Sequence, residues 1–371
     1  MKIAVVLSES EYFSPTHGGA CSIWVSEVYY YLKDMYQVTI YVSPHKNEFD
    51  SFDIVYIHNY KYLKMFKKIL PKKIFRKLKS LYNLSAAKHI GTNNYDVVHI
   101  HNRPEYVYNM RKYNPNIKII LHMHNDHLIK YSSKELYKIC SLVDVIVGCS
   151  KYITSNIIKA APEFKSKCYT VYNGVNLKTF NKIPIKEQYN FPIILFVGRI
   201  VKQKGLHILI QAFKEVLEMY PSAQLYIVGT AKATSRFKKN SYLKYLEAMS
   251  ADIKDNLSFI GSVPNKSLAT YYSIADVFVC PSIWEEPFGM VITEAMACEC
   301  AIVASKTGGI PEVVGNAGIL VDPNNVDALK SALIRILCNS RQKTTYGSMA
   351  RKRAEDLFRW ENIAKNFDIL L

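Results

Sequence analysis

Residues 144–148 read Asp144-Val145-Ile146-Val147-Gly148, and they decide the fold class of this chain. A nearly continuous apolar run of this length is typical of a strand that is buried on both faces, as in a parallel sheet covered by helices. Runs of the same kind lie on either side of it and alternate with helix-like segments. This alternation predicts an α/β protein built from βαβ units.

Two successive series of such units follow one another along the chain. The first is expected to contain a helix near Cys21–Lys33 and strands at Lys2–Ser8, Val38–Val42, Ile54–His58, Val97–His101, Ile117–His122 and Val143–Cys149. The second is expected to contain helices at Leu206–Tyr220 and Asn265–Ser273 and strands at Ile193–Val197, Gln224–Val228, Leu257–Ile260, Val277–Cys280 and Ala301–Ala304.

The two series predict two Rossmann-like domains that face an interdomain cleft, since 371 residues are too many for one ordinary core. We expect an N-terminal domain over residues 1–180 and a C-terminal domain over residues 191–350. Residues 181–190 between them are mostly polar and lack periodicity, which indicates a linker. Residues 351–371 have a helical pattern. Ligands of such sheets bind at the carboxyl ends of the strands, so we expect the site there.

Composition restricts the class of protein. Hydrophobic residues make up 49% of the chain, and no apolar run approaches the roughly 20 residues that cross a bilayer. The first apolar stretch soon meets Glu9 and Glu11, which favours a first strand over a signal peptide. The eight cysteines lack disulfide or zinc spacing, so we expect reduced thiols in a cytoplasmic protein.

The net charge of +17 is unevenly distributed. Residues 1–182 hold 26 lysines and arginines against 13 acidic residues, and the remainder holds 22 against 18. Residues 61–90 carry ten basic residues and no acidic one, with apolar residues on one helical face. This pattern predicts a basic amphipathic helix that binds an anionic membrane surface, such as the inner face of the cell membrane. The alternative is a core-packed helix with a solvated basic face. Nucleic acid is not expected, because no recognition motif accompanies the charge.

The most informative motif reads Trp284-Glu285-Glu286-Pro287-Phe288-Gly289-Met290-Val291-Ile292-Thr293-Glu294-Ala295-Met296-Ala297. Pro287 and Gly289 interrupt the backbone after a predicted strand, and good helix formers begin at Met290. The N–H groups and partial positive charge of a helix N-terminus suit a diphosphate. Glu286 before the helix and Glu294 inside it can accept hydrogen bonds from two hydroxyl-rich parts of one ligand.

The Glu-x7-Glu spacing around Pro-Phe-Gly resembles the signature of the retaining glycosyltransferases of family 4, which have the GT-B fold. The resemblance implies that Glu294 binds the ribose of a nucleotide-diphosphate sugar and that Glu286 binds the donor sugar. It also implies that the backbone N–H groups of Phe288, Gly289 and Met290 approach the sugar and the phosphate.

Further motifs carry the same resemblance. Residues 196–205 read Phe196-Val197-Gly198-Arg199-Ile200-Val201-Lys202-Gln203-Lys204-Gly205, and the family uses the positions of Arg199 and Lys204 to neutralise the diphosphate. The stretch Tyr172-Asn173-Gly174-Val175-Asn176 resembles the family's Asn-Gly-Val-Asp hinge motif, with Asn176 in place of the usual Asp. In His17-Gly18-Gly19, the absence of side chains at Gly18 and Gly19 would let the backbone approach the donor phosphate closely.

The resemblance extends to the nucleotide base and to the chain ends. Val228-Gly229 and Gly261-Ser262-Val263-Pro264 match the family's base-binding region in position, which implies that Gly229 and Val263 contact the base without revealing which base it is. The final helix is implied to cross back to the N-terminal domain. The stretches His101-Asn102-Arg103-Pro104 and His122-Met123-His124-Asn125 are similar to cell-surface polysaccharide and spore-coat-type members.

His124 ends a predicted strand, and the resemblance implies that it positions the donor sugar. The series His122-x-His124-x-x-His127 can also be interpreted as metal ligands, but no carboxylate or cysteine completes a clear site. The chain has no Asp-x-Asp motif, which argues against a Mg²⁺ ion that bridges the diphosphate. We therefore expect a metal-independent enzyme without a cofactor.

The resemblance implies that the anomeric configuration is retained. A double displacement needs a carboxylate nucleophile, and Glu286 is assigned to sugar hydroxyls, so a front-face substitution is favoured. We predict transfer of a hexose or N-acetylhexosamine from a nucleotide-diphosphate sugar, with a UDP-sugar favoured. The expected acceptor is a cell-surface polysaccharide, a lipopolysaccharide or a lipid-linked glycan.

Three other classes were weighed against this prediction. A hydrolase or epimerase of the same fold would act on a nucleotide sugar without transferring it. A spore-coat or surface protein would keep the fold without any enzymatic activity. A nicotinamide dehydrogenase is disfavoured, because no Gly-x-Gly-x-x-Gly follows the first strand.

Overall fold

The computed structural model describes residues 1–14, 19–44, 49, 51–57, 72–184, 189–230 and 241–371, with the backbone alone for 72–79. The chain forms two compact units. Unit 1 comprises Met1–Asn173 and Trp360–Leu371, and unit 2 comprises Gly174–Arg359. The first boundary between the units therefore lies between Asn173 and Gly174, inside the Asn-Gly motif, whereas the linker was expected at residues 181–190.

Unit 1 is built on a seven-stranded parallel sheet in the order β3-β2-β1-β4-β5-β6-β7. The strands are β1 (Lys2–Val6), β2 (Gln37–Val42), β3 (Asp53–Tyr56), β4 (Val97–His101), β5 (Lys118–Met123), β6 (Val145–Gly148) and β7 (Cys168–Thr170). The order reverses between β1 and β4, which opens a space outside their carboxyl ends. Every residue of β6 is buried, as the apolar run at 144–148 predicts.

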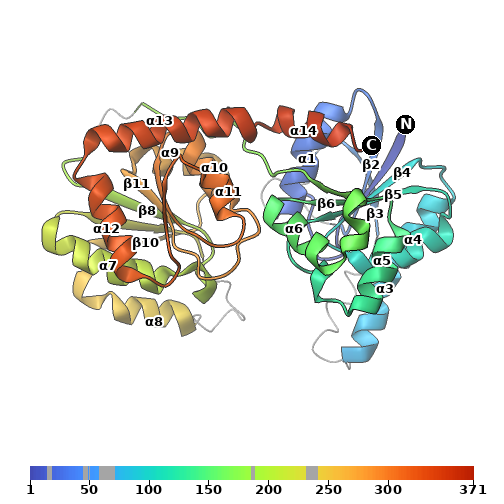
Figure 1. Ribbon diagram of the computed structural model, residues 1–371, viewed down its shortest axis with the longest axis horizontal. Coiled ribbons are helices and arrows are strands. Elements are labelled where there is room, and N and C mark those ends of the chain that lie inside the picture. The colour runs from blue at the N-terminus through green and yellow to red at the C-terminus, as the bar shows by residue number, and fades with distance from the viewer. Residues whose placement is uncertain (15–18, 45–48, 50, 58–71, 185–188, 231–240) are drawn as a thin grey trace. The chain divides into compact units, whose positions relative to one another are not determined.

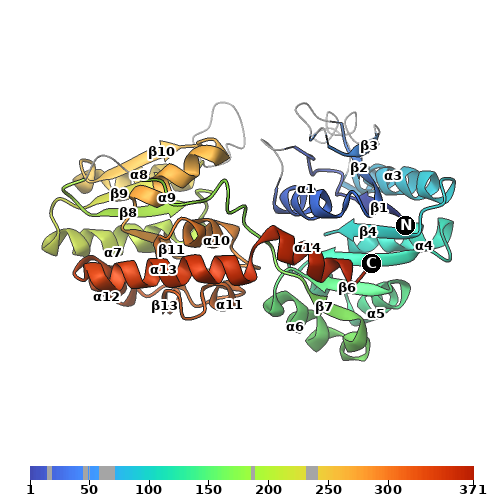
Figure 2. The same cartoon turned by 90° about the horizontal axis from the view of Figure 1, so that it is seen from above.

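Helices cover both faces of this sheet (Figure 1). They are α1 (Ala20–Leu32), α3 (Lys72–Gly91), α4 (Val107–Tyr113), α5 (Ser133–Leu142), α6 (Lys151–Ala160) and α14 (Trp360–Asp368). The last helix lies beside α1 in both views (Figures 1 and 2). Its Phe367 is fully buried and packs edge-on against Trp24, with ring centroids 5.0 Å apart. The last residues of the chain thus complete the core of its first unit.

Unit 2 is built on a six-stranded parallel sheet in the order β10-β9-β8-β11-β12-β13. The strands are β8 (Ile193–Val197), β9 (Gln224–Val228), β10 (Leu257–Gly261), β11 (Val277–Cys280), β12 (Ala301–Ser305) and β13 (Ile319–Val321). The helices are α7 (Leu206–Met219), α8 (Ser241–Met249), α9 (Leu268–Ile274), α10 (Met290–Ala297), α11 (Ile310–Val314), α12 (Val326–Leu337) and α13 (Ser340–Leu357). Here the order reverses between β8 and β11.

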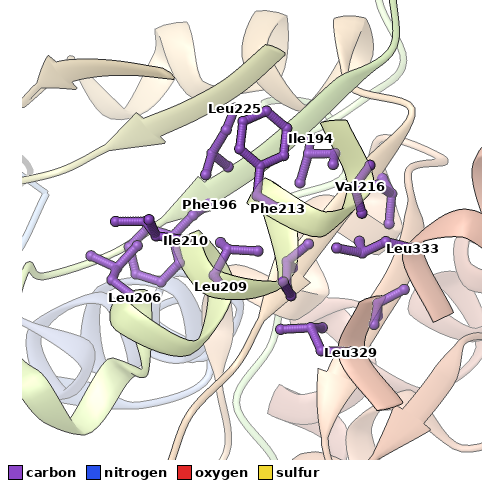
Figure 3. Close-up of a cluster of buried hydrophobic side chains, with 14 of the residues drawn as sticks. Ile194, Phe196, Leu206, Leu209, Ile210, Phe213, Val216, Leu225, Leu329 and Leu333 are labelled. Carbon is purple, nitrogen blue, oxygen red and sulfur yellow. The ribbon is translucent and has the colours of Figure 1, made fainter. Parts of the chain in front are cut away.

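The apolar stripe of α7 places this helix between the sheet and α12 (Figure 3). Leu206, Leu209, Ile210, Phe213 and Val216 recur at helical spacing and are all buried. They contact β8 and β9 on one side and Leu329 and Leu333 of α12 on the other. This packing holds the amino end of α7 at the edge of the sheet where the site lies.

The predicted fold class is confirmed, because both units are parallel sheets covered by helices. The helical pattern at 351–371 is interrupted, since α13 ends at Leu357 and α14 begins at Trp360. Between the two helices, Phe358 is buried and its carbonyl accepts a hydrogen bond from the N–H of Val175 at 2.7 Å. The expected helix at Asn265–Ser273 begins as a 3-10 turn at Asn265–Ser267 and continues as α9.

The basic segment at 61–90 lies partly outside the described residues. In the described end of α3, Tyr82, Ala86, Ala87 and Ile90 are buried in the core of unit 1, whereas Leu81 is exposed. Among the described residues, we find no helix with the length and apolarity that a membrane span requires.

Candidate functional site

The predicted site residues of unit 2 follow the carboxyl ends of neighbouring parallel strands. Arg199 and Lys204 follow β8, Gly229 follows β9, Val263 follows β10 and Glu286 follows β11. Because β8 and β11 flank the reversal of strand order, their carboxyl ends lie where ligands of such sheets generally bind. The sheet therefore gathers residues that are far apart in the sequence.

The Glu286 carboxylate is held through one of its two oxygens. Its Oε2 accepts hydrogen bonds from Lys204 Nζ at 2.5 Å, Trp284 Nε1 at 3.0 Å and Ser282 Oγ at 3.4 Å. The Lys204 and Glu286 side chains are only 13% and 12% exposed, so solvent screens this ion pair weakly. The three donors that the structure describes all reach Oε2.

Arg199 and Lys204 differ in their surroundings, although the sequence treats them alike. Arg199 is exposed, whereas Lys204 is bound to Glu286. An ammonium group has three N–H donors, so Lys204 keeps two for an anion while it holds the carboxylate. The spacing of the two motifs does not reveal this ion pair.

A glycine brings the loop after β8 against the loop after β11. Gly205 has φ +71°, and a Cβ atom there would lie 1.8 Å from the carbonyl oxygen of Pro281. The backbone N–H of Ile283 also donates to the carbonyl of Gln203 at 2.9 Å. This close approach places Lys204 beside Glu286.

The loop after β12 supports Glu286 from the other side, and sequence reasoning missed it. Gly309 N–H donates to the carbonyl of Glu286 at 2.7 Å, and Gly308 N–H donates to the Glu285 carboxylate at 2.6 Å. A Cβ atom at Gly308 would lie 2.3 Å from the Glu286 carbonyl oxygen. The available signal was a Gly-Gly pair in the loop after a predicted strand, as at residues 18–19.

Helix α10 begins beside this loop and carries the second acid. Gly289, with φ +94°, precedes its first residue Met290, and Phe288 is anchored in the core against Phe358 with ring centroids 5.5 Å apart. Glu294 is 9% exposed, and its Oε2 accepts a hydrogen bond from Tyr272 at 2.9 Å. Burial raises the pKa of Glu294 to about 7, and the hydrogen bond from Tyr272 opposes that rise. The sequence analysis did not identify Tyr272.

Unit 1 has its own cavity of 170 Å³ at the reversal of its sheet. Polar residues that follow β1, β4 and β5 line it, including Ser8, Glu11, Arg103 and His127. Gly18 lies outside the described residues. The N–H of Gly19 donates to Glu11 Oε1 at 2.8 Å, so this glycine orients a residue of the cavity wall.

A buried carboxylate that sequence reasoning missed fixes one wall of this cavity. Glu9 is 1% exposed and accepts hydrogen bonds from Arg103 Nε at 3.0 Å and from the Tyr106 hydroxyl at 2.6 Å. A buried ion pair with an additional donor holds both partners in one geometry. Arg103 therefore presents a fixed face to the cavity.

His124 is buried and bonded to a second histidine. Its Nε2 lies 3.0 Å from Nδ1 of His101, and its backbone N–H donates to Asn102 Oδ1 at 2.7 Å. Burial lowers the pKa of His124 to about 3, so the imidazole is neutral at physiological pH. His101, rather than His124, lines the cavity of unit 1.

Among the residues of unit 1 that the structure describes, two groups of buried side chains are close enough to share a metal ion. One is Cys21 with His101 and His124, and the other is His99 with His101 and His122. However, the His122 ring stacks on those of His99 and His124, with interplanar angles of 14° and 23°. Imidazole lone pairs lie in the ring plane, so rings stacked face to face do not direct them at one ion. For the group that contains His122, the geometry is therefore that of aromatic packing around Trp24.

Comparison with known proteins agrees with this architecture. Residues 178–353 match the family described as glycosyl transferases group 1, and residues 22–179 match glycosyltransferase family 4. The chain is 31% identical to spore coat protein SA of Bacillus subtilis, over 99% of this chain and 98% of that protein. It is 28% identical to the lipopolysaccharide 1,2-N-acetylglucosaminetransferase of Salmonella typhimurium, over 75% of this chain and 73% of that protein.

Solved structures share the fold. Sucrose-phosphate synthase from Thermosynechococcus elongatus has a TM-score of 0.79 at 23% identity, over 100% of this chain and 98% of that chain. Alr3699/HepE of Anabaena, in complex with UDP, has a TM-score of 0.79 at 20% identity, over 100% of this chain and 99% of that chain. The matches cover both units, and the chain belongs to the GT-B glycosyltransferases, with a family 4 region followed by a group 1 region.

Proposed function

We propose that unit 2 binds a nucleotide-diphosphate sugar and that the protein transfers the sugar, with retention of configuration, to a glycan or lipid-linked acceptor. The observation that carries this proposal is the ion pair of Lys204 and Glu286, which joins the loops after β8 and β11 where the strand order reverses, with Arg199 in the same loop as Lys204. Cations and helix N–H groups suit a diphosphate, and a largely buried carboxylate suits sugar hydroxyls.

The charge distribution fits the reaction that we propose. Cleavage of the sugar–phosphate bond builds negative charge on the leaving diphosphate, which fixed positive charge stabilises. Lys204 would hold Glu286 with one N–H and the diphosphate with the others, so the acid and the leaving group would keep a fixed separation. Arg199 would add the second cation without the help of a metal ion. The acceptor hydroxyl would lose its proton to an oxygen of the leaving phosphate.

The remaining assignments follow the family pattern. Glu294 would bind the ribose, Gly229 and Val263 the base, and the backbone of Phe288, Gly289 and Met290 the sugar and phosphate. For unit 1, the prediction that Gly18, Gly19 and His124 contact the nucleotide-sugar donor is kept.

The donor and acceptor classes rest on relatives. A similar structure was solved with UDP, which makes a UDP-sugar the first candidate. A similar enzyme is named for transfer of N-acetylglucosamine in lipopolysaccharide, which favours a surface glycan as acceptor. The basic segment at 61–90 would keep the protein at the inner face of the membrane, where lipid-linked acceptors lie.

A thermal-shift screen against UDP-, GDP- and ADP-sugars tests the proposal, because a ligand stabilises the fold that binds it. One donor should raise the melting temperature, and Arg199→Met should remove most of the rise. Lys202→Met is the matched control, since Lys202 is an exposed cation of the same loop. A rise that survives in Arg199→Met, or no rise with any donor, would count against the proposal.

A second candidate function is that of a surface protein without enzymatic activity. It is favoured by the similarity to a relative that is named a spore coat protein. Incubation of the donor alone, and of the donor with acceptor glycans, separates the candidates. Transfer requires both substrates, a hydrolase or epimerase consumes the donor alone, and a coat protein consumes neither.

A further inference from the structure

Glu294 depends on one neighbouring side chain for its orientation. Tyr272 of α9 is fully buried, and its hydroxyl donates to Glu294 Oε2 at 2.9 Å. Helices α9 and α10 are in contact, so this bond joins two packed elements. Among the described residues, Tyr272 is the side chain that forms a hydrogen bond with the Glu294 carboxylate. We propose that Tyr272 is a positioning residue of the donor site, which holds Oε2 of Glu294 and turns Oε1 toward the nucleotide.

The tyrosine is itself fixed by the core of unit 2. Its ring packs edge-on against Phe278 of β11, with centroids 5.6 Å apart, and against Phe180 at 6.2 Å. A tyrosine side chain has two rotatable bonds before the hydroxyl, so these contacts fix the position of its oxygen. The orientation of Glu294 is therefore set by the same strand whose loop carries Glu286.

The hydrogen bond from Tyr272 affects the protonation of Glu294, because the carboxyl group is buried. Burial raises the pKa of Cys298 at the end of α10, which also lies close enough to Glu294 for the charge to raise that pKa, and Arg351 of α13 and Glu299 also act on Cys298. Cys298 and Cys300 act in the same way on Tyr272. Arg351 is engaged with the carbonyl of Ala297 and with Glu355. Burial raises the pKa of Glu294 to about 7, and the bond from Tyr272 lowers it from where burial alone would set it.

The protonation state decides how Glu294 can bind a ribose. An ionised carboxylate accepts charge-assisted hydrogen bonds from ribose hydroxyls, whereas the protonated acid has lost that charge and one of its acceptor positions, so its hydrogen bonds to the ribose are weaker. The pKa of Tyr272 is raised well above its usual value, so its hydroxyl remains a donor throughout the range in which Glu294 titrates. Loss of this donor should shift the titration of Glu294 upward by about one pH unit.

This inference rests on the proposed function, and its test separates the two. We would measure UDP, GDP and ADP binding by calorimetry at pH 6.5, 7.5 and 8.5 for wild type and Tyr272→Phe. With the nucleotide that wild type binds, Tyr272→Phe should bind roughly tenfold more weakly at pH 6.5 and less than twofold more weakly at pH 8.5. Tyr271→Phe, a change on the neighbouring residue of α9, should match wild type at every pH.

A second measurement does not need a nucleotide. Carbon-13 labelling of glutamate carboxyl groups, with Glu294→Gln to assign the signal, should show a later titration midpoint in Tyr272→Phe than in wild type. An equal midpoint, or weaker binding by the same factor at every pH, would assign Tyr272 a packing role and overturn the inference alone. Failure of wild type to bind any of the three nucleotides would overturn the donor site, and the inference with it.

Discussion

Replacement of Glu294 by glutamine should stabilise unit 2 at alkaline pH. Glu294 is buried, and its pKa rises from the ordinary 4.5 to about 7. The folded state thus binds a proton at Glu294 more tightly than the unfolded state does. The stability that this proton contributes is fully present below pH 4.5 and is lost as the pH rises through 7. At about 1.4 kcal/mol per pKa unit, the buried charge costs about 3 kcal/mol at pH 8.5.

Glutamine keeps an acceptor for Tyr272 and removes the charge, so Glu294→Gln should recover that free energy. In scanning calorimetry at pH 8.5, the transition of unit 2 should rise by about 6 to 12 °C. At pH 5 less than about 1 kcal/mol remains to be recovered, and the two melting temperatures should nearly coincide. Glu218→Gln, on the exposed face of α7, is the control for a lost negative charge. A gain of the same size at both pH values, or none at pH 8.5, would refute the reasoning.

Three further predictions follow from the same contacts. Lys204→Met leaves the largely buried Glu286 without its cation and should lower the free energy of unfolding by about 2 to 4 kcal/mol, measured by denaturant titration; an unchanged midpoint would mean that the ion pair does not form. Gly205→Ala brings a Cβ within 1.8 Å of a carbonyl and should cost about 3 kcal/mol or more, whereas Gly261→Ala, with φ +84° and open space, should cost about 1 kcal/mol; equal losses would contradict the close approach. In flotation assays the protein should bind anionic vesicles through residues 61–90 and be released by salt, and failure to bind at low salt would discard the membrane surface.

Strands were the easiest elements to predict, because buried parallel strands are short apolar runs. Those at Ile193–Val197, Gln224–Val228 and Val277–Cys280 have the bounds that the sequence predicts. The short edge strands β7 and β13 were not predicted, because three residues carry too little pattern to stand out. The break between α13 and α14 was also missed, since helical periodicity runs through it and the bond between Val175 and Phe358 is a tertiary contact.

The site was predicted in part. Motifs select residues by spacing along the chain, so they identified Glu286, Glu294 and the cations after β8. They cannot reveal partners that lie close only after folding, such as Tyr272 beneath Glu294. They also cannot show that Lys204 and Glu286 bind each other, because only the neighbouring positions of β8 and β11 bring the two loops together.

The position of Phe367 against Trp24 has a consequence for how the nascent chain acquires its structure. The ribosome completes residues 1–173 long before it reaches Trp360, and at 5–20 residues per second the delay is roughly 10 to 40 seconds. During that interval the first half of the polypeptide would expose the apolar groove that α14 later fills. Chaperones that bind apolar surface would bind this groove. Deletion of residues 360–371 would likewise destabilise the amino-terminal half of the protein, because it removes α14 from the core of unit 1.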